Sequence, residues 1–247
     1  MLFTYQSYLY MVDKLRKNDY EICNYHNYER YDKCVILRHD VDNDLMKALM
    51  LAKLEQKYNI KSTYYFLLSS NFYNIASKES LDMIHQIDSM GHEIGLHFDE
   101  KKYEMCDKSR IRHKIIDEIH LMEAILNIPI KTISMHRPSE YVLENDLKLE
   151  EEGYINSYNN HFFKKFKYLS DSRMHWREDV LDIIKCCRYN KLHILTHPFW
   201  YSEQEKDMKT ILFEFVENAK IERWNNLNDN FRDLKSVLSR KEIDTFK

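Results

Sequence analysis

Aspartate and histidine residues gather in four short polar strings, each of which follows an apolar segment of the sequence. The strings lie at residues 38–42 (RHDVD), 91–97 (GHEIGLH), 134–138 (SMHRP) and 195–198 (LTHP). Imidazole and carboxylate groups together suit divalent Zn, Fe, Ni, Co or Mn, and the absence of cysteine from the strings argues against a closed structural zinc site. The residue types therefore indicate a divalent-metal site.

Strand alternation sorts these residues into two faces. In the segment 92–98, Ile94 and Leu96 share an apolar face that should pack under helices, so His97 points to the opposite, inward face. His92 falls on the apolar side, and we expect it to be structural.

The same alternation applies to the neighbouring strings. His136 faces inward because Met135 takes the apolar face, and Asp40 and Asp42 share a face with Arg38 if the first strand extends that far. Such residues have no packing role at the water-facing ends of parallel strands, so their clustering favours a functional site. The inward set comprises Asp40, Asp42, His97, His136 and His197.

Alternating strands and helices must bring these strings together. We expect strands at 33–39, 62–69, 92–98, 132–136, 154–159, 166–169 and 192–196. We expect helices at 44–58, with Asp42 or Asn43 as the N-cap, and at 80–90, 110–126, 179–189 and 203–222. This order predicts an α/β fold with a parallel sheet, either doubly wound or closed, and seven strands favour closure toward a barrel. The polar strings then lie at the C-terminal ends of the strands, where such folds place their active sites.

Composition sets the wider limits. The chain has 247 residues, of which 44% are hydrophobic and 31% charged, and it contains no repeat or linker, so one domain over 1–247 is expected. The formal net charge of -3 gives no indication of a nucleic acid polymer as a partner. No stretch approaches the roughly 20 apolar residues of a membrane span.

Two features favour a cytoplasmic protein. The N-terminal residues lack the basic, apolar and small-residue regions of a signal peptide. The five cysteines are odd in number and lack zinc-finger spacing, which favours reduced thiols.

The ordered motifs resemble those of the polysaccharide deacetylases, the chitooligosaccharide deacetylase homology domain. The string at 91–97 is similar to the family's Gly-His-Glu-Ile-Gly-x-His motif, and 40–42 resembles the Asp-x-Asp form of its first motif. Arg137-Pro138, 171–176 and 194–198 resemble three further motifs in the family's order. The resemblance covers about 34–201 and implies a distorted (β/α)7 barrel.

The resemblance also implies roles for single residues. Asp40 would be the general base, His197 the general acid, and Arg137 would hold Asp40 in its ionised form. Asp42 and His97 would bind one divalent metal ion, with Zn as the first expectation and Fe, Co, Ni or Mn as alternatives. The implied reaction hydrolyses the N-acetyl group of an amino sugar and yields acetate and a free amine.

One position departs from the family. The second metal histidine usually lies four residues after the first, where this chain has Lys101. His136 is the best substitute, because it faces inward, and Asp99 and Glu100 are the alternatives.

Aromatic residues beside the motifs suit a sugar substrate, because aromatic faces stack on sugar C–H surfaces. The substrate-binding residues that we expect are Asp171, Trp176, Trp200 and Tyr201. The competing interpretation is that the aromatic rings cap the barrel.

Two other functions remain open at this point. Lys101 motivates a non-catalytic glycan-binding protein on the same fold, and the same site chemistry could hydrolyse another non-peptide C–N bond. For the deacetylase, we expect an intracellular precursor of surface-glycan assembly, such as a nucleotide-linked or lipid-linked N-acetylated sugar. The identity of the sugar and the oligomeric state stay open.

Overall fold

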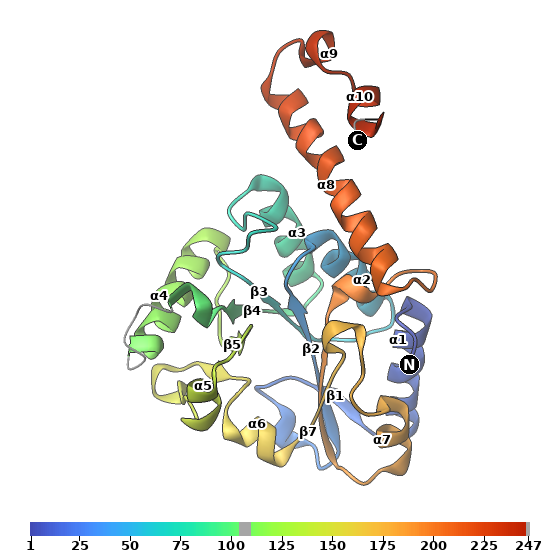
Figure 1. Cartoon of the computed structure of the whole chain (residues 1–247). Helices are drawn as coiled ribbons and strands as arrows, with labels where there is room; N and C mark the ends of the chain where they lie inside the picture. Colours follow the sequence, from blue (N-terminus) through green and yellow to red (C-terminus); the bar gives the residue numbers. More distant parts are fainter. Residues whose placement is uncertain (104–109, 246–247) are drawn as a thin grey trace. The chain divides into compact units, whose positions relative to one another are not determined.

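Seven strands that follow the predicted segments form one parallel sheet (Figure 1). The computed structural model describes residues 1–103 and 110–245. The strands are β2 (Cys34–Val41), β3 (Thr63–Phe66), β4 (Glu93–Phe98), β5 (Thr132–Met135), β6 (Ile155–Asn156), β7 (Lys167–Ser170) and β8 (Lys191–Thr196). An eighth strand, β1 (Glu21–Cys23), was not predicted and pairs with the first residues of β2.

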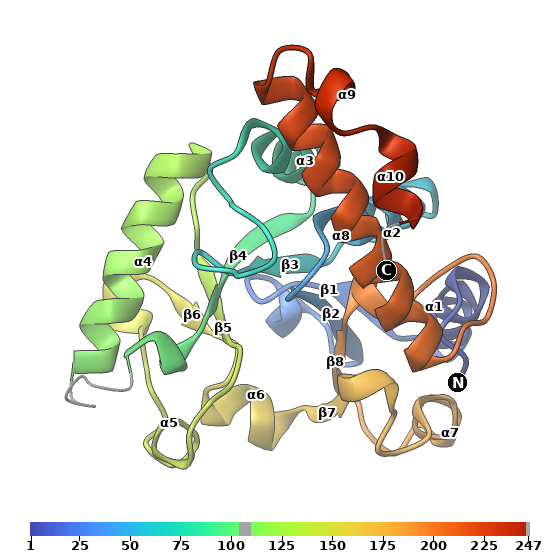
Figure 2. The same cartoon turned by 45° about the horizontal axis from the view of Figure 1, so that its top comes forward.

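The strand order explains the shape of the sheet. The order is β6-β5-β4-β3-β2-β8-β7, so β6 and β7 are the two ends of the path. Every pairing along the path is parallel. The sheet curls into a half-barrel with helices outside it, which confirms the predicted distorted (β/α)7 barrel (Figures 1 and 2).

All but one of the α-helices in the first unit begin at a side-chain cap. The first unit contains α1 (Tyr5–Lys17), α2 (Leu45–Lys57), α3 (Lys78–Ser89), α4 (Ile111–Leu126), α5 (Glu140–Glu144), α6 (Asn160–Lys165) and α7 (Val180–Cys186). The cap of α2 is Asp44, whose carboxylate accepts from the Lys47 amide at 3.1 Å. The expectation of a cap at Asp42 or Asn43 is therefore wrong, because β2 runs on to Val41 and the helix begins later.

The core confirms the predicted strand faces. Ile94, Leu96 and Phe98 of β4 are buried in one apolar cluster with residues of α3 and α4. The inner face of the same strand is crowded at Gly95, where a Cβ atom would lie 2.5 Å from the Tyr65 ring. Glycine therefore allows the β3 tyrosine to cross the barrel interior.

The chain divides into two compact units, Met1–Glu203 and Gln204–Lys247. The first contains the sheet and the whole motif-bearing stretch, 34–201. The second contains α8 (Met208–Asn230), α9 (Leu234–Val237) and α10 (Arg240–Thr245). None of the helices described within 1–103 and 110–245 has both the length and the apolar character needed to cross a bilayer.

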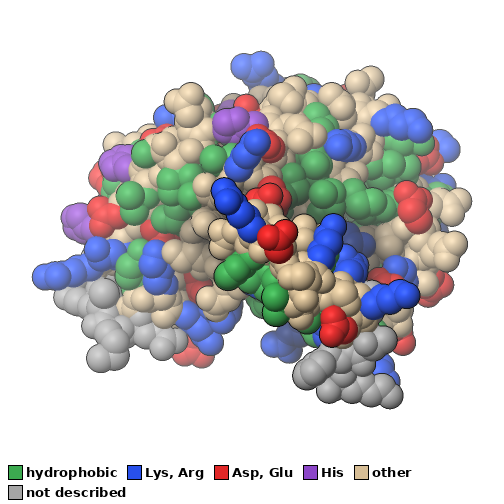
Figure 3. Space-filling view, turned by 90° about the horizontal axis from the view of Figure 1, so that it is seen from above, with side chains coloured by type: hydrophobic (Ala, Val, Ile, Leu, Met, Phe, Trp, Pro, Cys, Tyr) green, Lys and Arg blue, Asp and Glu red, His purple; other side chains and the backbone are tan. Residues whose placement is uncertain are grey.

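Surface charge and thiols complete the description. Figure 3 shows Lys and Arg side chains interspersed with Asp and Glu on the face in view. Among the described residues, Cys23, Cys34, Cys186 and Cys187 are free thiols, and Cys106 lies outside the described residues.

Candidate metal and catalytic site

Three residues of the predicted inward set bring their ligand atoms together. Asp42 follows β2, His97 lies in β4 and His136 follows β5. His97 Nε2 lies 3.1 Å from Asp42 Oδ1, and His136 Nδ1 lies 3.2 Å from the same oxygen. The two imidazole nitrogens are 3.1 Å apart, so the three atoms form a nearly equilateral triangle.

This triangle fits a divalent metal ion. Ligand atoms placed 2.0–2.1 Å from a tetrahedral ion lie about 3.3–3.4 Å from one another, close to the observed separations. Burial opposes ionisation of Asp42, but hydrogen bonds from His136 and His97 hold the pKa of its carboxyl well below the usual range. Two imidazoles and one ionised carboxylate are the donor set of open catalytic zinc sites and of non-heme iron sites.

The two alternative ligands have other partners. Asp99 accepts hydrogen bonds from the guanidinium of Arg137, one of them from Nε at 3.2 Å. Glu100 accepts from the backbone amide of Ser139 at 2.8 Å and from its hydroxyl at 2.7 Å. Of the three side chains considered in place of a histidine at Lys101, His136 is the one whose ligand atom lies in the triangle.

Asp40 lies beside the triangle with a buried guanidinium next to it. Arg38 Nη2 donates to Asp40 Oδ2 at 3.0 Å, and His97 Nε2 lies 3.6 Å from the same oxygen. The other oxygen, Oδ1, is buried and has no hydrogen-bond partner among the described residues. One oxygen of Asp40 is thus held in place, while the other keeps its lone pairs for a proton.

Arg38 is the partner of Asp40 that the sequence did not predict. Its side chain is fully buried, with its Cζ 5.5 Å and 4.8 Å from the ring centroids of Tyr65 and Tyr158. Its second terminal nitrogen donates to Ser157 Oγ at 2.7 Å. The contact with Asp40 was expected of Arg137, which donates instead to Asp99 and whose side chain is 49% exposed. The signal for Arg38 was its position two residues before Asp40, on the same strand face.

His197 approaches the triangle from β8. Its Nε2 lies 3.9 Å from Asp42 Oδ2, and its Nδ1 lies 2.6 Å from Asp171 Oδ1. Burial would lower the pKa of His197, but the charge and hydrogen bond of Asp171, with the charges of Asp42 and Asp40, raise it to about 9. Asp171 was expected to bind substrate, and the structure instead places it, fully buried, behind the imidazole.

The three predicted aromatic residues all pack in one apolar cluster. Trp176 is a buried member of it and also lines a cavity next to the site. Tyr201 is fully buried and packs edge-on against Tyr8 at 5.8 Å between ring centroids, and Trp200 packs on the same apolar cluster. Tyr201 therefore belongs to the core, as the capping interpretation holds, and is too deeply buried to touch a sugar.

Behind the sheet, a second polar network lies on the opposite face of β2. Glu55 of α2 is fully buried and accepts hydrogen bonds from the hydroxyls of Tyr8 at 2.5 Å and Tyr64 at 2.7 Å. His39 Nε2 lies 3.1 Å from the carboxylate, and His39 Nδ1 lies 2.6 Å from Thr196 Oγ1. His92 lies at the rim of this network, 3.7 Å from Glu55, on the face predicted for it.

No protein-family model matches the sequence, and no curated protein matches it. Several solved structures are similar in fold to this protein. A CE4-family pseudoenzyme from Bacillus anthracis is 16% identical with a TM-score of 0.46, and the likeness covers 76% of this chain and 62% of that one. The chain therefore spans just under two thirds of the length of that protein.

Two further structures belong to the same group. A polysaccharide deacetylase from Bacillus cereus is 14% identical with a TM-score of 0.44, covering 72% of this chain and 93% of that one. A family 4 carbohydrate esterase from Bacillus anthracis is 16% identical with a TM-score of 0.43, covering 85% and 86%. These structural neighbours come from the polysaccharide deacetylase family whose motifs the sequence resembles.

Proposed function

We propose that this protein is a metal-dependent hydrolase that removes the N-acetyl group from an amino sugar. One observation carries the proposal: Asp40 and His197 both lie beside the Asp42–His97–His136 triangle. Each of them contacts a buried group of opposite charge, Arg38 for Asp40 and Asp171 for His197. A glycan-binding site needs neither the base with its guanidinium nor the acid with its carboxylate.

The side chains divide the reaction between them. Asp42, His97 and His136 would hold the ion, which supplies Lewis-acid polarisation of the acetamide carbonyl. Asp40 would take a proton from the attacking water on its open Oδ1, while Arg38 holds Oδ2. Water adds to the carbonyl carbon, the C–N bond breaks, and acetate and an amine result.

His197 supplies the proton that the leaving amine needs. Its Nδ1 faces Asp171, so Nε2 is the nitrogen that faces the site. The raised pKa of His197 keeps this proton in place at neutral pH. A cation held at Asp42 would lower that pKa by repulsion, which would ease the transfer.

The test is acetate release from a panel of N-acetylated sugars by zinc-loaded protein. We expect Asp40→Asn and His197→Ala each to lose about 10²–10⁴-fold in turnover while metal content stays at the wild-type level. Glu144→Gln, an exposed change on α5, is the matched control and should keep full turnover. Sugar binding without acetate release in the wild type would instead favour the glycan-binding alternative.

A further inference from the structure

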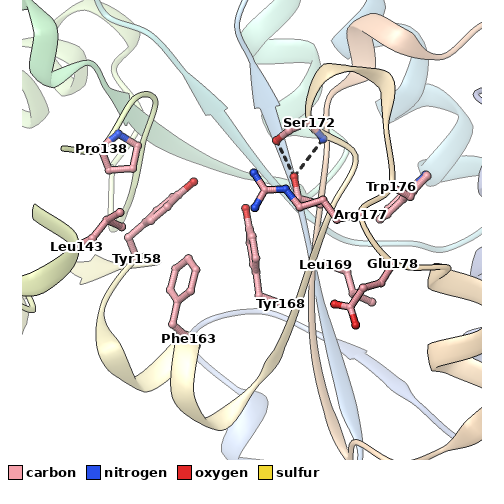
Figure 4. A pocket seen from close by; sticks show the side chains of 11 residues that line it. Pro138, Leu143, Tyr158, Phe163, Tyr168, Leu169, Ser172, Trp176, Arg177 and Glu178 are labelled. Carbon is pink, nitrogen blue, oxygen red and sulfur yellow. Dashed lines mark hydrogen bonds between the residues drawn. The ribbon is translucent and has the colours of Figure 1, made fainter. Parts of the chain in front are cut away.

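A cavity lies beside the catalytic residues, between the two end strands of the half-barrel. It has a volume of about 360 Å³, which is within the range of small-molecule sites. Its walls come from β7 and from the segments that follow β5, β6 and β7, and they include Pro138, Tyr158, Tyr168, Ser172 and Trp176 (Figure 4).

Chain connectivity and contacts join this cavity to the site. Ser170 and Ser172 line it, and Asp171 between them holds His197. Tyr158, on the opposite wall, packs on the guanidinium of Arg38, which in turn donates to Asp40. A sugar whose acetamide lies between Asp40 and His197 would thus have its next substituent near this cavity.

Arg177 gives the cavity a positive charge. Its side chain reaches toward the hydroxyl ends of Tyr158 and Tyr168 (Figure 4). Within residues 1–103 and 110–245, no acidic side chain forms an ion pair with Arg177. The one acid of the lining, Glu178, pairs with Lys167. The guanidinium is therefore available to a ligand.

We propose that this cavity binds an oxyanion carried by the substrate, with Arg177 as the group that recognises it. A guanidinium offers paired N–H donors that match the oxygens of a phosphate or a carboxylate. The tyrosine hydroxyls and Ser170 and Ser172 add hydrogen-bonding groups, while the aromatic rings suit a sugar or base face. The substrate is then an anionic N-acetyl sugar, a sugar phosphate or an N-acetylated aminouronic acid, rather than a neutral glycan. The identification of the ligand as the substrate rests on the proposed function. Anion binding in the cavity can be tested separately from that function.

Binding to metal-free protein tests the cavity separately from catalysis. The probes are N-acetylglucosamine 1-phosphate, N-acetylglucosaminuronic acid and the neutral methyl N-acetylglucosaminide, measured by calorimetry in EDTA. We expect the wild type to prefer an anionic probe, and Arg177→Gln to weaken that probe about 10–100-fold while leaving the neutral one unchanged. Arg177→Lys should recover part of the loss. Arg173→Gln, a change at another exposed arginine of the same loop that does not line the cavity, is the control.

The outcomes separate the two proposals. A preference for the phosphate or for the uronate supports the oxyanion site and shows whether the anion is a phosphate or a carboxylate. Equal affinity for all three probes, or equal losses in Arg177→Gln and Arg173→Gln, overturns it, even if zinc-loaded protein releases acetate. If anion binding depends on Arg177 but no probe or sugar releases acetate, the proposed deacetylase function is wrong and the proposed anion site is supported.

Discussion

Replacing the buried Glu55 by glutamine should destabilise the protein strongly. Burial would raise the pKa of Glu55, but the charge and hydrogen bond of His39, with His92 and Tyr8, lower it from its ordinary 4.5 to about 2. A fall of that size corresponds to about 3 kcal/mol in favour of the folded protein, at about 1.4 kcal/mol per pKa unit.

The assay is urea and thermal unfolding followed by circular dichroism, with EDTA present so that metal binding does not contribute. Glu55→Gln should lower the free energy of unfolding by about 3–4 kcal/mol at pH 7. At about 2–4 °C per kcal/mol for a chain of this size, Tm should fall by roughly 6–16 °C. The exposed Glu144→Gln is the matched control and should stay within about 0.5 kcal/mol of the wild type.

The pH dependence of unfolding gives an independent check that ionised Glu55 stabilises the folded protein. Because the folded-state pKa of Glu55 is depressed, its contribution is complete above the ordinary value of 4.5 and is lost as the pH falls toward 2. The difference between wild type and Glu55→Gln should therefore shrink between about pH 5 and pH 2. A difference below 1 kcal/mol at pH 7, or one that grows on acidification, would refute the assignment of Glu55 as a stabilising buried carboxylate.

Three further changes test the two faces of the sheet. His136→Ala should weaken zinc binding at least about 100-fold in a competition titration, because it removes one corner of the ligand triangle, and unchanged affinity would exclude His136 as a ligand. His92→Asn should lower the free energy of unfolding by about 1–3 kcal/mol through its contact with Ser62 while zinc affinity stays constant, and the reverse pattern would place His92 at the metal. Gly95→Ala should cost about 1–3 kcal/mol in urea unfolding, because the new Cβ meets the Tyr65 ring at 2.5 Å, and a neutral result would mean that the ring moves freely.

Strand alternation predicted that His97 and His136 face the same side of the sheet, because side-chain direction in a strand is a local property. His97 follows from its apolar neighbours Ile94 and Leu96, and His136 follows from Met135, without knowledge of which strands are adjacent. Parallel pairing then brings the two histidines together, since His97 lies opposite Ser134 in the register of β4 and β5. The barrel fold was predictable for the same reason, from alternating segments of sufficient length.

Contacts made by long side chains across the barrel were not predictable in this way. Arginine is rarely buried completely, so the shared strand face of Arg38 and Asp40 was not enough to predict their contact. The link between Asp171 and His197 depends on β7 lying next to β8, with Ser170 opposite Leu195, and strand order cannot be read from the spacing of the segments. The three-residue β1 was missed because so short an apolar run carries no periodicity.

The register of β2 and β8 relates the buried Glu55 network to the candidate site. His39 lies opposite Thr196 in that pairing, and the two side chains are hydrogen-bonded on the face that holds Glu55. Asp40 and His197 are the next residues along each chain, so their side chains emerge on the other face. The separation of Asp40, the proposed base, and His197, the proposed acid, is thus set by one strand pairing that a buried carboxylate network holds from behind. Strands position side chains more accurately than loops do, which is what the proposed proton transfers at one C–N bond would require.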